Sequence, residues 1–550
     1  MRFTRNLITA AILMQAASVY AANVPDAGQS IRMLEPENRY RPSDFNVQLQ
    51  PSAVDRKAPV KPGGTAIKVN QFIIDGNTVI SSVVLSRIVS PYQGKELTIG
   101  EIQGVADSIS EYYHQQGFFL AKAYLPRQEI GEGKVTIQVL EGRYDHIGFN
   151  NASDSSDATI QRYLSHVHTD DVVKRDVLER QMLLISDLPA VEVKSTLKPG
   201  TRVGTTSLEV DTKSSSRVSG YFDSDNYGNK YTGTNRFGLT LNVNNPLGIG
   251  DQLSTRVMTS EAQQKYSRIA YQAPIGASGL QLGASYSEMN YRLGEEFSDF
   301  DAKGNSRITS AYGLYPLLRT RQSNISASLQ FDNTVLKDDV DLFDSKSKKT
   351  INSWTLGFNG SSYDDFMGGG LNSFAVNYQT GILNIQSDDV KFIDNLSAKS
   401  DGHFTKLDGM VSRTQRVTNK LNLTGKISGQ IADNNLDSSV KFDVGGSQGV
   451  RAFKQGDSSG DTGWLANLDL RYSVTENVVV NTFYDYGEVT YSRKAWDSSK
   501  NKATRSGAGV GLDVFGANWK VSMVGAWNTG GKPDSSEEGR QFWVQLLKAF

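Results

Sequence analysis

Side chains suited to acid–base or metal chemistry are few in this sequence. The 550 residues include five histidines, and only His166 and His168 lie close together. An HxH pair can hold a metal, but no carboxylate or third histidine lies at helical spacing beside it to complete a ligand set. A polar surface is the better interpretation of this pair, and we expect no metal site. The other histidines are His114, His146 and His403.

Nucleophilic and nucleotide chemistry is also poorly represented. The chain has no cysteine, which excludes thiolate nucleophiles, iron–sulfur clusters and disulfide frameworks. HExxH and P-loop motifs are absent from the sequence. Gly507-x-Gly509-x-Gly511 resembles part of a dinucleotide loop, but no helix or acidic partner follows, so small inward-facing residues on a strand explain it more simply. We expect no enzymatic activity and no cofactor.

The net charge and the mean hydropathy exclude one class of partner and one class of fold. The net charge of −1 predicts no binding to nucleic acid. The mean hydropathy of −0.40 excludes a bundle of transmembrane helices, which needs repeated apolar runs of about 20 residues. It does not exclude a transmembrane β-barrel, because barrel strands are apolar on one face only.

Residues 1–21 have the pattern of a secretory signal peptide. Arg2 and Arg5 precede the apolar run Leu7–Ala17, and the small residue Ala21 ends the segment. The alternative is an N-terminal membrane anchor, but the run is too short to span a membrane. We therefore expect export, and a cysteine-free exported protein suits the envelope of a Gram-negative cell.

Residues 22–65 are rich in proline and poor in apolar side chains. This composition predicts an extended linker, with one short helix around Gln29–Tyr40. The prolines of this segment are Pro25, Pro36, Pro42, Pro51, Pro59 and Pro62.

Two small α/β modules are predicted at residues 66–143 and 144–213. In each, strands with a period of two surround helices with a period of 3.6. The first module has predicted strands at 67–77, 118–125 and 134–140 and a helix at 98–116. The second has predicted strands at 144–149, 190–197 and 206–211 and helices at 158–164 and 171–186.

From residue 214 to residue 550 the helical period disappears. Large apolar residues alternate with small or polar ones, for example over 237–243, 325–331 and 519–523. We count about sixteen antiparallel strands, the first near Arg217–Tyr227 and the last at Gln541–Phe550. The pattern is typical of a transmembrane β-barrel. The alternative is a soluble β-sandwich or propeller.

The connections between these strands favour the barrel, because short and long connections alternate as periplasmic turns and extracellular loops do. The short ones are 244–250, 274–279, 316–323, 413–420, 473–477 and 515–518. The long ones are 291–308, 332–352, 383–404, 432–463, 487–506 and 528–540.

Several strings in the two modules resemble POTRA domains of outer-membrane secretion transporters. The first module carries Tyr113-x-x-x-Gly117-Phe118 and Val139-x-Glu141-Gly142-Arg143. The second carries Glu179-Arg180-x-x-Leu183-Leu184-x-x-x-Leu188-Pro189. The strings are long and stand in the family's order.

Two motifs in the barrel region carry the resemblance further. Val450-Arg451-Ala452-Phe453, in the longest loop, resembles the VRG(Y/F) motif of POTRA-bearing barrels, which in that superfamily folds back into the barrel. Ala452 stands where the family usually has glycine. Phe483-x-Asp485-x-Gly487 matches the family's FxDxG strand motif, and Phe550 resembles the terminal aromatic residue that the barrel assembly machinery recognises. The chain resembles a TpsB transporter of two-partner secretion, of the hemolysin secretion/activation type.

Asp485 and Arg451 are predicted to form a salt bridge inside the barrel. Alternation along 478–487 places Asp485 on the face opposite Tyr484 and Tyr486, which is the lumen if the tyrosines face lipid. From the residues alone, a solvated arginine and a pore-lining aspartate that never meet are the simpler interpretation. The motif match favours a salt bridge that docks the loop, because an arginine can bind a confined carboxylate with two hydrogen bonds.

The resemblance implies a function and partners. A large exoprotein would be recognised by the POTRA domains through its N-terminal secretion domain and would pass unfolded through the barrel without ATP. The barrel would sit as a monomer in outer-membrane lipid, with the POTRA domains in the periplasm, and the segment near Gln29–Tyr40 would occupy the resting pore. An assembly factor of the same superfamily, a porin and a surface adhesin remain alternatives. The cargo could be a cytolysin, an adhesin, a contact-dependent toxin or a haem-acquisition protein.

Overall fold

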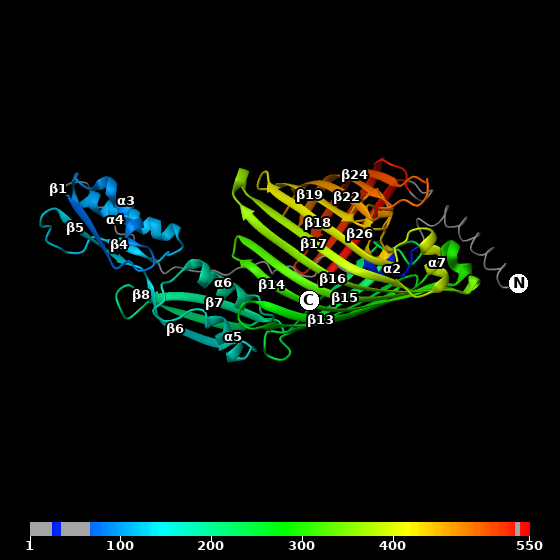
Figure 1. Cartoon of the computed structure of the whole chain (residues 1–550), viewed down its shortest axis with the longest axis horizontal. Helices are drawn as coiled ribbons and strands as arrows, with labels where there is room; N and C mark the ends of the chain where they lie inside the picture. Colours follow the sequence, from blue (N-terminus) through cyan, green and yellow to red (C-terminus); the bar gives the residue numbers. More distant parts are fainter. Residues whose placement is uncertain (1–24, 35–65, 534–538) are drawn as a thin grey trace.

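The computed structural model describes residues 25–34, 66–533 and 539–550. Two α/β modules lie in a row beside one end of a large tilted barrel (Figure 1). The predicted signal peptide, residues 1–21, and most of the predicted linker lie outside the described residues.

The first module packs two helices on two small sheets. Its three-stranded sheet has the order β2-β5-β4, and β1 pairs with β3. Thr98 and Glu101 form a reciprocal capping box that starts the long helix α4. The elements are β1 (Ile67–Lys68), β2 (Gln71–Asp75), α3 (Ser82–Val89), η1 (Ser90–Tyr92), β3 (Glu96–Leu97), α4 (Ile99–Gln115), β4 (Lys122–Tyr124) and β5 (Lys134–Leu140).

Helix α3 is a difference from the sequence analysis, which predicted no helix there. Its sequence, SVVLSRIV, is rich in β-branched residues with low helix propensity. The helix forms because Leu85 and Val89 are completely buried in the core of the module, so packing outweighs propensity. The predicted strand at 118–125 is shorter, Lys122–Tyr124.

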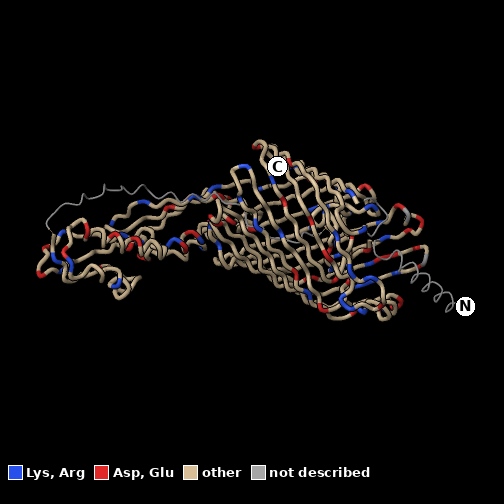
Figure 2. Tube along the Cα trace, turned by 90° about the horizontal axis from the view of Figure 1, so that it is seen from above, with Lys and Arg blue, Asp and Glu red and all other residues tan. Residues whose placement is uncertain are grey.

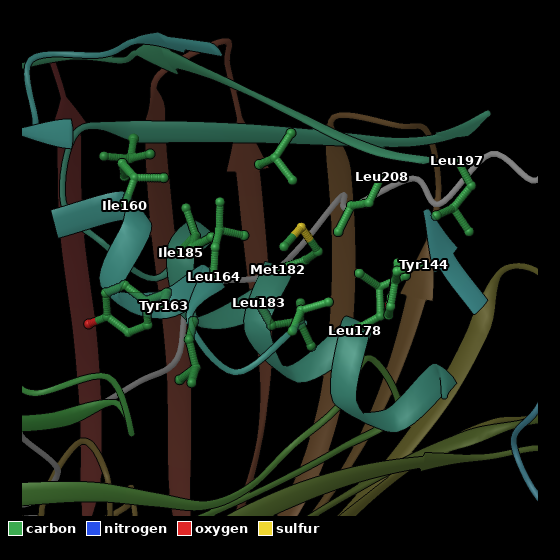
Figure 3. Packing of buried hydrophobic residues seen from close by; sticks show 14 of the residues in the cluster. Tyr144, Ile160, Tyr163, Leu164, Leu178, Met182, Leu183, Ile185, Leu197 and Leu208 are labelled. Atoms are coloured by element: carbon green, nitrogen blue, oxygen red, sulfur yellow. The ribbon is translucent and has the colours of Figure 1, made fainter. Parts of the chain in front are cut away.

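The second module repeats this architecture with a sheet in the order β6-β8-β7. Helices α5 and α6 lay Ile160, Leu178 and Met182 on the sheet, where all three side chains are fully buried (Figure 3). The elements are β6 (Arg143–Ala152), α5 (Asp157–Leu164), α6 (Arg175–Ser186), β7 (Val191–Pro199) and β8 (Thr205–Ser214).

Sixteen antiparallel strands then close into a barrel, which confirms the predicted fold class. The last strand, β26, pairs with the first, β9, from Gln545↔Asp225 to Ala549↔Tyr221. The strands are β9 (Val218–Asp225), β10 (Arg236–Asn244), β11 (Gln252–Ser260), β12 (Lys265–Ile275), β13 (Leu280–Arg292), β14 (Ala302–Arg319), β15 (Ser323–Val340), β16 (Ser345–Asp364), β17 (Gly370–Ile385), β18 (Gly402–Arg416), β19 (Leu421–Ala432), β22 (Thr462–Ser473), β23 (Val478–Thr490), β24 (Lys502–Phe515), β25 (Trp519–Gly530) and β26 (Arg540–Ala549).

Burial alternates along the barrel strands. On β16, Trp354, Leu356 and Phe358 are exposed on the outer face, whereas Ile351 and Ser353 are buried on the inner face. The exposed apolar residues form the lipid-facing surface, and the polar residues between them line the lumen. No helix in residues 25–34, 66–533 and 539–550 is long and apolar enough to cross a membrane.

The predicted long loop at 332–352 is wrong. Strands β15 and β16 stay paired from Ser323↔Ser362 to Val340↔Ser345, so only residues 341–344 connect them. The polar side chains that suggested a loop are pairs on a hairpin that continues beyond the apolar band. Its outer face is charged there, and its inner face packs against the helix Ala27–Arg32 and the connection between β19 and β22. The other connections carry η2 (Glu295–Phe300), η3 (Asp341–Phe343), η4 (Phe366–Gly368), α7 (Asp388–Leu396), η5 (Ser438–Val440) and the small hairpin of β20 (Phe442–Asp443) and β21 (Ser459–Gly460).

A short helix, α2 (Ala27–Arg32), lies inside the barrel outline, next to β14, β15 and η5 (Figure 1). Asp26 caps it by accepting a hydrogen bond from the Gln29 N–H. The sequence analysis placed a helix around Gln29–Tyr40. The helix instead begins two positions earlier and ends at Arg32, and residues 35–40 lie outside the described residues.

Candidate functional site

The long connection between β19 and β22 folds back into the lumen rather than standing above the barrel. Its β20–β21 hairpin pairs antiparallel, and the Val450 N–H donates to the Val444 carbonyl at 2.7 Å. Val444, Val450 and Phe453 are almost completely buried against residues of β22–β25. Because its apolar residues are buried, the connection has one defined position.

Arg451 at the tip of this connection meets two carboxylates of the barrel wall. Its Nη2 lies 2.7 Å and its Nε 2.8 Å from the two oxygens of Asp485, and its Nη1 lies 2.8 Å from Asp469. The Arg451 backbone N–H also donates to Asp485 at 3.0 Å. The guanidinium carbon lies 3.5 Å from the ring centre of Phe483, which is a close cation–π contact. The structure therefore brings the two residues of the predicted salt bridge together.

Strand β23 presents this face because its side chains alternate. Phe483 and Asp485 are buried toward the lumen, and Tyr484 between them is exposed on the outer surface. Asp485 has no exposed side-chain area, and Arg451 has 13%. A carboxylate buried this deeply requires a cation with hydrogen bonds to both oxygens, which the guanidinium supplies.

The glycine string on β24 makes room for the motif. Gly507, Gly509 and Gly511 stand opposite Asp485, Phe483 and Asn481 in the strand register. A Cβ on Gly509 would overlap the Phe483 ring, and a Cβ on Gly507 would lie 2.6 Å from the Cβ of Ala452. Ala452 itself is not among the described residues with positive φ, so glycine is not required there, and its methyl group packs into the space above Gly507.

Three residues of this site were missed by the sequence analysis. Asp469 is the second carboxylate on Arg451, and the side-chain amide of Asn467 donates to Asp485 at 2.8 Å. The indole N–H of Trp543, on the last strand, donates to the Arg451 carbonyl at 2.7 Å. Alternation was the available signal for all three, because each is flanked by outward-facing apolar neighbours in its strand.

A second ion pair fixes the returning half of the connection. Arg505 of β24 binds Asp457 at 2.9 Å, and both side chains are 5% exposed. The Arg505 guanidinium also lies 5.2 Å from the centre of the Phe453 ring. Both sides of the connection are thus held by charges on the barrel wall.

The same connection holds α2. Arg32 of the helix binds Asp443 at 2.6 Å, and the Ser438 hydroxyl donates to Asp26 at 2.6 Å. On the opposite side the Ala27 N–H donates to Asp338 of β15 at 2.8 Å. Helix, connection and wall form one polar network in the lumen.

The junction between the two modules centres on Glu141 of the Glu141-Gly142-Arg143 string. This carboxylate accepts hydrogen bonds from the backbone N–H groups of Thr78 at 2.6 Å and Val79 at 2.9 Å, and from the hydroxyl of Tyr113 at 3.0 Å. Arg143 binds it at 3.0 Å. Burial raises the pKa of Glu141, but these hydrogen bonds outweigh burial and hold the pKa below its ordinary value.

The second module binds the near end of the barrel through the residues of its own motif. Arg180 donates to the Pro316 carbonyl at 2.8 Å, and Glu179 accepts from the Arg321 N–H at 2.6 Å. Asp187 and Arg319 form a bidentate pair with distances of 2.8 and 2.9 Å. Arg319 is only 3% exposed.

The remaining predicted residues occupy the surface or the seam. His166 and His168 are exposed just after α5, and the described residues contain no group of three or more potential metal ligands. Phe550 lies on the seam, where its backbone exchanges hydrogen bonds of 3.0 and 3.1 Å with Gly220. Its ring contacts Phe222, with the centroids 5.6 Å apart.

Comparisons with known proteins agree with this architecture. The family model "Haemolysin secretion/activation protein ShlB/FhaC/HecB" matches residues 204–514, and the "POTRA domain, ShlB-type" model matches residues 67–142. The chain is 31% identical over 549 residues to the Heme/hemopexin transporter protein HuxB of Haemophilus influenzae, which covers 97% of this chain and 96% of that protein. It is 25% identical over 496 residues to the Outer membrane transporter CdiB of Escherichia coli, with coverages of 85% and 81%.

Solved structures show the same fold. CdiB from Escherichia coli superimposes with a TM-score of 0.73 at 18% identity and covers 98% of both chains. CdiB from Acinetobacter baumannii gives 0.66 at 17% identity, covering 92% of this chain and 95% of that chain. The family match, the POTRA region and the closed barrel agree with one another. The chain therefore belongs to the ShlB/FhaC/HecB family of haemolysin secretion/activation proteins, the TpsB transporters of two-partner secretion, and is a translocation pore of the Gram-negative outer membrane with its POTRA domains in the periplasm.

Proposed function

We propose that this transporter exports a large exoprotein in unfolded form through the barrel lumen, without ATP or a catalytic step. The observation that carries the proposal is how the lumen is filled. Helix α2 and the connection between β19 and β22 are held there by side-chain contacts such as Arg32–Asp443 and Arg451–Asp485. Such contacts can break while the strand pairing of the wall stays intact.

We propose that α2 is the resting plug. A helix of six residues is unstable alone in water, so α2 is helical because the lumen holds it. Once Arg32 and Asp26 lose their partners, the segment can leave as an extended chain. Folding of the cargo outside the cell would then bias the movement outward.

The periplasmic modules would receive the exoprotein through its N-terminal secretion domain. Strands β4 and β7 each lie at the edge of their sheet. An edge strand offers free N–H and C=O groups to which an extended segment can add as a further strand.

The relatives favour one class of cargo. Identity to HuxB, whose name is Heme/hemopexin transporter protein, is 31% over nearly the whole chain, compared with 25% to CdiB of Escherichia coli. We propose that the partner exoprotein serves haem or hemopexin acquisition. Loss of growth on hemopexin-bound haem after deletion of the partner's gene would support this class, and unchanged growth would oppose it.

We further propose that the protein is a monomer in outer-membrane lipid and that the barrel assembly machinery recognises its last strand through Phe550. The aromatic ring lies at the seam and is 52% exposed, so it is accessible before the seam closes. Phe550→Ala should lower the amount of folded barrel in the membrane without changing the secretion activity of each folded molecule.

Gene deletion tests the proposal. Cells without this transporter should retain the exoprotein in the periplasm while other outer-membrane barrels stay at normal levels. A general loss of barrels would instead indicate an assembly factor. A variant lacking residues 25–34 should also conduct more ions in planar bilayers, because its lumen is unplugged.

A further inference from the structure

The outer face of the β15–β16 hairpin carries a pair of like charges without counter-ions. Lys337 and Lys348 stand directly opposite each other in the strand register. Side chains in such a pair lie roughly 5 Å apart, and like charges at this spacing destabilise a sheet. Both residues are exposed, and one pair further along the exposed Lys346 stands opposite Asp339. An anion placed between the two ammonium groups would relieve this repulsion.

In the part of the chain that the structure describes, no carboxylate stands opposite Lys337 or Lys348 in the strand register. Neighbouring cations of the same face do have partners there: Arg307 binds Glu288 at 3.3 Å and Lys303 binds Asp341 at 2.6 Å. Lys346 differs from Lys337 and Lys348, because it stands opposite Asp339. The ammonium groups of Lys337 and Lys348, which we call the hairpin lysines, are therefore available to an external ligand.

The position of the hairpin lysines identifies the ligand. Lys337 continues the outward-facing row of β15 whose apolar members run from Ile325 to Val335, and Lys348 continues the row of Trp354 on β16. An apolar band of about 25 Å needs roughly ten tilted residues, so the band ends next to the lysines. The near end of β15 lies beside the Asp187–Arg319 contact with the periplasmic module. The lysines therefore lie at the extracellular boundary, at the end of the barrel away from the modules, where lysine and arginine residues are also seen among the loops (Figure 2).

We propose that the hairpin lysines bind the phosphate groups of lipopolysaccharide in the outer leaflet. Clusters of basic residues at the edge of a membrane's apolar region recognise anionic headgroups by charge. The outer leaflet of a Gram-negative outer membrane presents the phosphorylated glucosamines of lipid A at this level. A phosphate between Lys337 and Lys348 would turn their repulsion into two attractive contacts.

Each hairpin lysine is adjacent in sequence to a residue that contacts the plug or the lumenal connection. Asp338, next to Lys337, points into the lumen and accepts the Ala27 N–H of α2. Lys349, next to Lys348, points inward and binds Asp437 at 2.9 Å. Lipid bound on the outer face would therefore hold in place the strand positions of Asp338 and Lys349, which contact the plug and the lumenal connection on the inner face.

Binding of lipid A to the purified full-length protein in detergent tests the proposal by native mass spectrometry. The wild-type protein should bind bisphosphorylated lipid A more tightly than the same lipid stripped of its phosphates. The K337Q/K348Q variant should bind it about tenfold or more weakly, because each lysine contributes to attraction of the headgroup. K337R/K348R should keep the affinity. The matched control is K198Q/K213Q, which removes two exposed lysines of the second module and should change nothing.

Two results would overturn the assignment. The first is that the wild type and K337Q/K348Q bind bisphosphorylated lipid A with equal affinity. In this comparison both proteins must show the heat-dependent gel shift of a folded barrel. The second is that inorganic phosphate, at the same concentration as lipid A, displaces the lipid. The lysines would then be a site for free phosphate. Charge reversal gives a second readout: K337E creates an opposite-charge pair with Lys348, so it should abolish lipid A binding and leave the barrel folded.

Discussion

Arg451 shows how one side chain can hold a long connection. Its guanidinium uses Nε, Nη1 and Nη2 for two carboxylates while its face lies on Phe483. A lysine could not make this set of contacts, because its ammonium has no planar fork and no face to stack. The Arg451–Asp485 pair could be predicted from the sequence, because the two motifs name these residues and the alternation along β23 directs Asp485 into the lumen.

We expect Arg451→Ala to undock the connection and to abolish secretion. The change leaves Asp485 buried without its cation, at a cost of about 3–5 kcal/mol. Trypsin added outside the cell should then cleave at Lys454. Arg451→Lys should be intermediate, and Arg493→Ala, which removes an exposed loop arginine, serves as the control. Normal secretion by both Arg451→Ala and Asp485→Ala would show that docking is dispensable.

The interior glycines of β24 give a steric prediction. Gly509→Ala should impair secretion, because the added Cβ overlaps the ring of Phe483 and displaces the face that binds Arg451. Gly425→Ala on β19 is the matched control, since a Cβ there meets no atom within 4 Å. Both variants should be compared by exoprotein release per folded barrel. Equal exoprotein release by the two variants would show that the close packing of Gly509 against Phe483 is not needed for secretion.

Glu141 gives a pH prediction for the first module. Its folded pKa lies below the unfolded value, so its stabilising contribution is present above the unfolded pKa and is lost as the pH falls through the folded pKa. The helical ellipticity, most of which comes from the modules, should melt at a lower temperature at pH 3 than at pH 6. Glu141→Gln should be less stable at pH 6 and should lose part of this pH dependence. An unchanged pH dependence in Glu141→Gln would contradict the assignment, and the exposed Glu129→Gln is the control.

Whole elements were predictable where a period was long and regular. The sixteen strands follow from alternation, and α4 follows from its apolar spacing and its cap. Helix α3 was missed because its β-branched residues favour strands, and tertiary burial decides its fold. The β15–β16 hairpin was underestimated because the apolar outward row gives way to charged residues beyond Val335, although strand pairing continues.

The site shows a similar limit. Trp543 lies on the last strand, 92 residues from Arg451 in the sequence, and Asp469 lies on β22, 18 residues after Arg451. Both meet Arg451 because the connection folds back into the lumen. Asp469 alternates with the outward residues Leu468 and Leu470, so its inward direction could be derived. Its partner could not, because the sequence does not state which strands lie across the lumen from the folded connection.

The contact between the second module and the barrel includes the ion pair of Asp187 with Arg319. Arg319→Ala removes the bidentate partner of Asp187 at a site where the arginine is almost completely buried. We expect the module to detach, so that protease cleaves near residues 214–217 and secretion falls. Arg321→Ala should be harmless, because only the backbone N–H of Arg321 binds Glu179. Equal protease resistance of the two variants would mean that the ion pair does not hold the module.

At the scale of the whole molecule, three parts act in sequence along one axis. The modules sit at one mouth, the wall encloses the lumen, and α2 with the docked connection fills it (Figure 1). Charge pairs join each part to the next: Asp187–Arg319 at the mouth, Arg451–Asp485 at the wall and Arg32–Asp443 at the plug. Because the wall is closed by strand pairing alone, these pairs can exchange without opening the barrel.

A reversible lock on α2 tests the central claim, which is that cargo passes through the lumen that α2 fills. A Cβ placed on Gly28 lies 2.5 Å from the Ser438 hydroxyl oxygen, which is short enough for a disulfide after a small shift, and the chain has no other cysteine. In cells carrying G28C/S438C, release of the exoprotein should stop under oxidising conditions and return when a reductant is added. Each single-cysteine variant should secrete in both conditions. Equal release by the oxidised and the reduced double variant would show that the cargo does not take this path.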